Sequence, residues 1–147
     1  MAQKGKTKKS QIRKTEAYVD TSAFIAFLDG SDSYHPLFLR LFSESPPLIT
    51  SSLVIAEGHG WFLKRYDRLK AFQFLSFIED LNVLTIISVG QDELSAATKL
   101  LRKYSDQDLT QVDAVGLYLL KKYGINNCWS TDFHLGLTGV PLVIHQH

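Results

Sequence analysis

Short apolar runs alternate with longer amphipathic segments along most of this chain. The runs have the length and residue types of β-strands, and the unbroken one at 84–89 is typical of a strand covered on both faces. Pro141 begins the last run, which we therefore expect at an edge of the sheet, where proline is tolerated. The pattern predicts four or five strands, at residues 17–19, 48–50, 84–89, 127–130 and 141–144.

Amphipathic segments with helix-capping residues separate these strands. Thr21 or Ser22 offers an N-cap hydroxyl to the first helix, and Thr110 with Asp113 three positions later matches a capping box. Strands that alternate with helices favour right-handed crossovers and a parallel sheet. We therefore expect an α/β fold on a mainly parallel sheet, with helices at 23–28, 36–42, 52–66, 68–81, 91–104 and 111–122.

Length and composition narrow the class of protein. The chain has 147 residues, of which 45% are hydrophobic, as expected for one domain with a sizeable core. Cys128 is the only cysteine, so a disulfide framework and a cysteine-based zinc site are excluded. No apolar run approaches the roughly 20 residues of a membrane-spanning helix. We expect a cytoplasmic protein that has no membrane partner.

Charge is distributed unevenly along the chain. Of its 16 basic and 15 acidic residues, six bases and one acid fall in residues 1–16, which leaves residues 17–147 with a net charge of −4. We therefore expect a basic N-terminal arm (1–16) in front of one globular domain (17–147). The arm fits a solvated, disordered tail, an electrostatic contact for nucleic acid phosphates, or an organellar transit peptide. Its bases are Lys4, Lys6, Lys8, Lys9, Arg13 and Lys14.

Four carboxylates occupy positions that can converge. Asp20 and Asp132 follow predicted strands, Glu57 lies in the helix after the second strand, and Asp113 lies in the first turn of a later helix. Ligands of open α/β sheets bind beyond the carboxyl ends of the strands. Clustered carboxylates repel one another, and a divalent cation relieves that repulsion. Oxygen ligands suit Mg²⁺ or Mn²⁺, although each acid alone also fits a helix cap or a solvated face.

Four segments in order resemble the motifs of the PIN-domain family, and within it the VapC-like toxins of toxin–antitoxin pairs. The likeness extends over about residues 17–147, which is nearly everything except the basic arm. Any single motif is weakly specific, whereas all four together in this order are a specific signal. The segments are YVDTSAF at 18–24, TSSLVIAE at 50–57, YSDQDLTQVDA at 104–114 and STDFH at 130–134.

This resemblance implies a three-layer α/β/α fold and a metal-dependent endoribonuclease that uses Mg²⁺ or Mn²⁺. RNA would be its substrate and an antitoxin protein its partner. Asp20, Glu57, Asp113 and Asp132 match the family's acidic cluster, as both catalytic residues and metal ligands. Accessory roles fall to Thr21, Ser22, Thr131, Asp106 and Asp108, the last two lying in the loop that leads to the third motif.

Two alternatives to a toxin stay open. The basic arm is longer than such toxins usually carry, and Asp67 stands where many members have glycine, which favours an RNA-maturation nuclease. An inactive RNA-binding or assembly module is the other alternative, although clustered acids would only repel RNA. The apolar stripe at 69–81 suggests a homodimer, but burial within one chain would explain it equally. We expect His134 at the surface.

Overall fold

The computed structural model describes residues 15–147, and a four-stranded parallel sheet lies at its centre. The strands are β1 (Ala17–Val19), β2 (Leu48–Ser51), β3 (Leu84–Ile87) and β4 (Cys128–Trp129). Their order across the sheet is β3-β2-β1-β4, and every neighbouring pair is parallel. The predicted mainly parallel sheet is therefore confirmed, with four strands.

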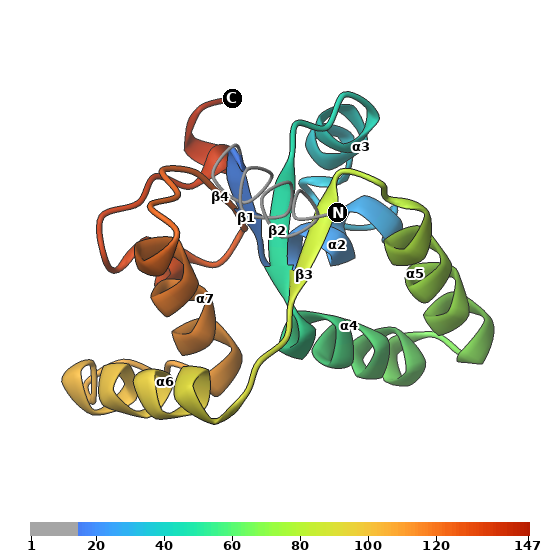
Figure 1. Cartoon of the computed structure of the whole chain (residues 1–147). Helices are drawn as coiled ribbons and strands as arrows, with labels where there is room; N and C mark the ends of the chain where they lie inside the picture. Colours follow the sequence, from blue (N-terminus) through green and yellow to red (C-terminus); the bar gives the residue numbers. More distant parts are fainter. Residues whose placement is uncertain (1–14) are drawn as a thin grey trace, which may run out of the picture.

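Helices cover both faces of this sheet, which gives the three layers seen in Figure 1. Four helices lie on one face, and two lie on the other, as part of the connection from β3 to β4. The α/β/α architecture is thus confirmed. The first group is α2 (Thr21–Leu28), α3 (His35–Ser43), α4 (Ser52–Arg65) and α5 (Arg68–Asp80); the second is α6 (Gln91–Lys103) and α7 (Gln111–Lys122).

The predicted strand at 141–144 is wrong. Leu142 forms only an isolated bridge with Cys128, and the chain then continues as a short 3₁₀ helix, Val143–His145. The extended backbone ends at Leu142, because the 3₁₀ helix begins at Val143 and turns the chain away from the ladder. Pro141 contributes its carbonyl, which accepts from the Cys128 N–H at 3.0 Å, but it has no N–H to return.

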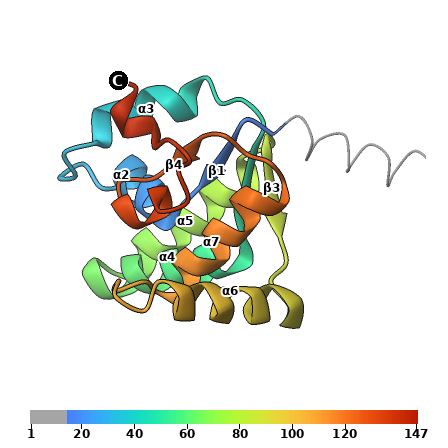
Figure 2. The ribbon, with the colours of Figure 1, turned by 90° about the vertical axis from the view of Figure 1, so that its left-hand side faces the viewer.

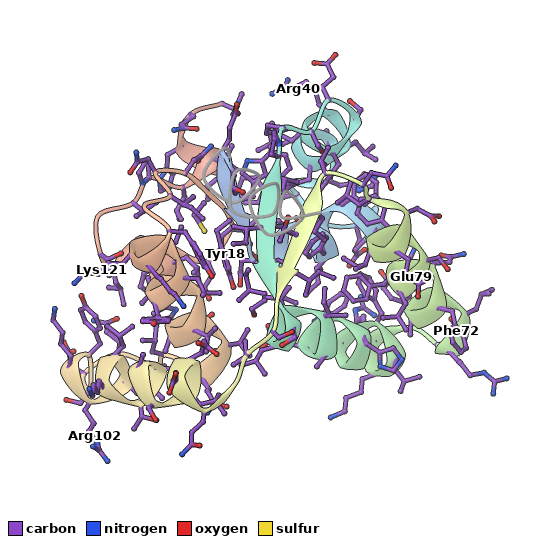
Figure 3. The ribbon with its side chains drawn as sticks, in the orientation of Figure 1. Tyr18, Arg40, Phe72, Glu79, Arg102 and Lys121 are labelled. Carbon is purple, nitrogen blue, oxygen red and sulfur yellow. The ribbon has the colours of Figure 1, made fainter. Side chains whose placement is uncertain are left out.

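Aromatic side chains form much of the core between the sheet and α2–α5. Phe24 packs against Phe42 with ring centroids 5.5 Å apart, and Phe42 packs edge-on against Trp129 of β4 at 5.0 Å. The apolar stripe of α5 is divided: Phe74 is fully buried, whereas Phe72 is 56% exposed and points away from the sheet (Figure 3). Most of the stripe therefore belongs to the core of a single chain.

The strand order sets the position of the site. The chain passes from β1 through β2 to β3 at one edge, and then crosses to β4 on the other side of β1. Open α/β sheets bind ligands where the strand order reverses in this way. Asp20 directly follows β1, and Asp132 follows β4 by three residues. Both acids therefore lie at the switch point of the sheet.

Two further predictions concern the basic arm and membrane-spanning helices. The basic side chains from Lys4 to Lys14 lie outside the described residues, so the role of the arm stays a prediction. Within residues 15–147, no helix combines the length and the apolar character needed to cross a membrane.

Candidate active site

Asp20 is the N-cap of α2. It has an extended backbone (φ −85°, ψ 160°), and its Oδ2 accepts from the Ser22 N–H at 3.3 Å. The sequence left two interpretations open: a cap at Thr21 or Ser22, which is wrong, and a cap at Asp20, which is confirmed. The carboxylate at the end of β1 reaches the orphan N–H two residues ahead, so the helix already begins at Thr21. Asp20 is 4% exposed.

Two serine hydroxyls, one from α2 and one from the segment after β4, bind the same oxygen of this carboxylate and lie 3.1 Å from each other. Ser22 Oγ donates to Asp20 Oδ2 at 2.7 Å, and Ser130 Oγ donates to the same oxygen at 3.0 Å. Each hydroxyl also accepts a backbone N–H: that of Thr131 for Ser22, at 3.0 Å, and that of Asp132 for Ser130, at 2.9 Å. This network joins the end of β1 to the segment after β4.

Ser130 is a site residue that the sequence analysis did not single out. Its position at the end of β4, two residues before Asp132, was the available signal. Thr131, predicted as an accessory hydroxyl, contributes its backbone N–H to the network.

Asp113 combines a structural role with a place in the site. It forms the predicted capping box with Thr110: the Asp113 N–H donates to Thr110 Oγ1, and the Thr110 N–H donates to Asp113 Oδ2, both at 3.1 Å. This pairing fixes the carboxylate at the N-terminus of α7, where the helix dipole favours negative charge. Asp113 is 7% exposed.

Asp132 caps a short 3₁₀ helix, Phe133–Gly136, and holds a histidine beside the acids. Its Oδ1 accepts from the His134 N–H at 3.0 Å and lies 2.8 Å from His134 Nδ1. The expectation of a surface His134 is wrong, because the tight 3₁₀ turn folds its ring back onto Asp132 and leaves the side chain 16% exposed. One ligand atom each from Asp113, Asp132 and His134 lie within 4.8 Å of one another.

Glu57 completes the set from α4 and is the most exposed of the four acids. Partial burial raises the pKa of its carboxyl, and the negative charges of Asp113 and Asp132 raise this pKa further. The Thr21 hydroxyl lowers the pKa of Glu57, but its geometry falls short of a hydrogen bond. The four predicted acids therefore converge electrostatically, although they come from four different elements.

Burial and mutual repulsion disfavour negative charge throughout this cluster. Burial raises the pKa of Asp20 to about 6, and Asp113 raises it as well, against the lowering effect of the Ser22 and Ser130 hydroxyls. Burial also raises the pKa of Asp113, with a further contribution from Asp132, while His134 opposes it. A bound cation would stabilise all of these carboxylates in their charged form.

The donor atoms of the cluster fit a hard divalent cation. Carboxylate oxygens dominate the set, as Mg²⁺ and Mn²⁺ prefer. Within residues 15–147, the buried Thr21 Oγ1 has no hydrogen-bond partner, which leaves one more oxygen available beside Glu57. His134 adds one nitrogen beside Asp132.

Asp106 and Asp108, predicted as accessory residues, do not join the cluster. Both are exposed in the loop between α6 and α7. Neither side chain takes part in a hydrogen bond or an ion pair within the part of the chain that the structure describes. The third motif therefore contributes Asp113 alone among its acids.

The sequence and the fold both resemble known proteins. The family model described as PIN domain matches residues 17–135. The 23S rRNA-specific endonuclease VapC20 of Mycobacterium tuberculosis, found in strains CDC 1551 / Oshkosh and H37Rv, is 26% identical over 123 residues, which cover 83% of this chain and 93% of the relative.

Solved structures show the same fold. The crystal structure of Mycobacterium tuberculosis VapC20, described as a Sarcin–Ricin loop cleaving toxin, has a TM-score of 0.78 at 24% identity, over 85% of this chain and 96% of that one. PAE2754 from Pyrobaculum aerophilum has a TM-score of 0.63 at 17% identity, over 90% and 93% of the two chains. The resemblance inferred from the four motifs is thereby confirmed, and the chain belongs to the PIN domain family.

Proposed function

We propose that this protein is a metal-dependent endoribonuclease and the toxin of a toxin–antitoxin pair. The observation that carries the proposal is the convergence of Asp20, Glu57, Asp113 and Asp132 at the switch point of the sheet. The similarity to VapC20, whose name describes a 23S rRNA-specific endonuclease, supports RNA cleavage and makes ribosomal RNA the first substrate class to test.

Each acid has a distinct place in the proposed chemistry. Asp20, Asp113 and Asp132 would hold Mg²⁺ or Mn²⁺, and Ser22 and Ser130 would orient the Asp20 carboxylate. A divalent cation at this position stabilises charge on a phosphate group and lowers the pKa of a nearby water.

Glu57 is the most exposed acid of the cluster and has a raised pKa, so it is suited to accept a proton from the attacking water. Attack in line with the leaving oxygen then cleaves the phosphodiester bond. Alternatively, Glu57 holds a second cation.

The proposal is tested by cleavage of labelled ribosomal RNA by the full chain with Mg²⁺, with Mn²⁺ and with EDTA. We expect cleavage with either metal and none with EDTA. Asp20→Asn should abolish cleavage, because it removes a charged ligand while its amide can keep the serine hydrogen bonds. Asp80→Asn is the matched control, since Asp80 is exposed on α5 outside the cluster. Undiminished cutting by the Asp20→Asn protein would overturn the site assignment.

The proposed partners follow from the proposed role. A toxin requires a cognate antitoxin protein, and a cytoplasmic location agrees with an RNA substrate. A homodimer remains part of the proposal, because Leu69 and Phe72 of α5 are 66% and 56% exposed. Large exposed apolar side chains of this kind are typical of protein contacts.

A further inference from the structure

A second cleft lies between α6 and α7, away from the four acids. It has a volume of about 1080 Å³, and Leu137, Thr138 and Val140 also line it. Lys99 and Lys103 of α6 line it together with Lys121 and Lys122 of α7. Figure 2, viewed from the side of these two helices, shows α7 above α6, and Figure 3 shows Lys121 on the outer side of α7.

The charge of this cleft is uncompensated. Within residues 15–147, no acidic side chain lines it, and the single ion pair is that of His134 with Asp132. Asp106 and Asp108, which follow α6 in the sequence, lie outside the lining. Four exposed lysines therefore face one cavity on a domain whose overall charge is negative.

Aromatic rings hold two of these lysines in place. Lys103 Nζ lies 5.4 Å from the centre of the Tyr104 ring, and Lys122 Nζ lies 5.8 Å from that of Tyr118. Cation–π contacts of this length restrain the ammonium groups. Among the residues that the structure describes, Lys99 and Lys121 have no such contact.

The stabilising effect of positive charge at helix C-termini explains the positions of only some of these lysines. Lys103, Lys121 and Lys122 belong to the last turns of their helices, where positive charge interacts favourably with the helix dipole. Lys99 lies outside the last turn of α6. The dipole also does not explain why all four lysines share one cleft.

We propose that this cleft binds the phosphate backbone of RNA, as a contact site separate from the acidic cluster. The inference rests on the proposed function and extends it. The acidic cluster repels a polyanion, so cations elsewhere must supply much of the binding free energy.

Helix α7 connects the two sites. Asp113 lies in its first turn and Lys121 in its last. They are eight positions apart in the sequence, which corresponds to about 12 Å along the helix axis. An RNA that extends a few nucleotides beyond the phosphodiester bond at the acidic cluster is therefore long enough to contact both sites.

The test compares Lys99→Gln/Lys121→Gln with a matched double variant, Arg68→Gln/Arg102→Gln. Each removes two exposed positive charges, and neither Arg68 nor Arg102 lines the cleft. Binding is measured in the Asp20→Asn background by fluorescence anisotropy, with a labelled RNA hairpin that carries a single-stranded tail, over a series of salt concentrations.

We expect the lysine variant to bind the hairpin on the order of tenfold more weakly at low salt. The slope of the logarithm of the binding constant against the logarithm of the salt concentration should fall in magnitude by about 0.7 for each lost phosphate contact. The arginine variant should bind with a slope close to that of the parent. Equal slopes for both variants would overturn the inference. Polyglutamate serves as a second, protein-like polyanion in the same assay. If the lysine variant loses polyglutamate binding but binds RNA as the parent does, the inference is overturned in favour of an acidic protein partner.

A cleavage assay separates this inference from the proposed function. With Asp20 restored, the lysine variant should cut a short oligonucleotide as fast as wild type and the tailed hairpin more slowly. If wild type cuts neither RNA while the lysine variant still loses hairpin binding, the proposed function fails and the binding site stands. If both RNAs are cut equally fast by wild type and the lysine variant, the binding site fails and the nuclease stands.

Discussion

Ser130 at the end of β4 donates its hydroxyl to the carboxylate of Asp20 at the end of β1, at 3.0 Å and across 110 positions of the sequence. The same Ser130 hydroxyl accepts the N–H of Asp132 at 2.9 Å. One side chain therefore sets the relative position of two acids of the cluster. This contact exists because β1 and β4 are neighbours in the sheet.

Ser130→Ala should lower the rate of RNA cleavage by roughly tenfold or more, because a hydrogen bond to a charged group contributes about 1.5–3 kcal/mol. It also leaves the Asp132 N–H without its acceptor. The measurement is the single-turnover cleavage rate at saturating Mg²⁺. Ser43→Ala is the control, since the Ser43 hydroxyl caps only the Arg40 carbonyl in α3. Equal rates for the two variants would contradict the positioning role of Ser130.

The metal-free protein should lose stability as the pH rises. Burial raises the folded-state pKa of Asp20 to about 6 from its ordinary value of 3.8, so between these values the folded protein keeps a proton that the unfolded chain releases. This contribution is fully present below pH 3.8 and is lost as the pH rises through about 6. Its size is about 3 kcal/mol at 1.36 kcal/mol per pKa unit.

Asp20→Asn isolates this contribution, because asparagine does not titrate. In EDTA, chemical denaturation should show that the variant is more stable than wild type above pH 6, and that the difference shrinks at lower pH. Saturating Mg²⁺ should stabilise wild type more than the variant at neutral pH. If the difference in unfolding free energy between the two proteins did not change with pH, the raised pKa of the buried Asp20 would be contradicted.

Two glycines of α4 should respond oppositely to alanine. A Cβ at Gly58 would lie 2.5 Å from Cζ of the buried Phe74, whereas a Cβ at Gly60 would meet nothing within 4 Å. Gly58→Ala should therefore cost about 1–3 kcal/mol through overpacking. Gly60→Ala should stabilise the protein by up to about 1 kcal/mol through helix propensity. Thermal denaturation of both variants checks the packing of α4 against α5, and equal midpoints would contradict it.

Expression in a bacterial host tests the role as a toxin. Induction of the wild-type chain should arrest growth, because cleavage of ribosomal RNA stops translation. Asp20→Asn should relieve the arrest at matched expression levels, and a cognate antitoxin should relieve it when co-expressed. Unimpaired growth with an active nuclease would favour the RNA-maturation role. The readout is the growth rate together with the integrity of total RNA.

The sequence by itself determined the local elements and the identity of the acids. Alternation of apolar runs with capped helices predicted the parallel sheet, because helix and strand periodicity are local properties. The capping box at Thr110 and Asp113 was read from four consecutive residues for the same reason.

Only the tertiary structure decided which distant groups meet. The adjacency of β1 and β4 brings Ser130 to Asp20, and the 3₁₀ turn after β4 brings His134 to Asp132. The predicted strand at 141–144 ends at Leu142 because the chain turns into a 3₁₀ helix at Val143. These outcomes depend on strand order and on packing between segments far apart in sequence, which no local pattern of residues encodes.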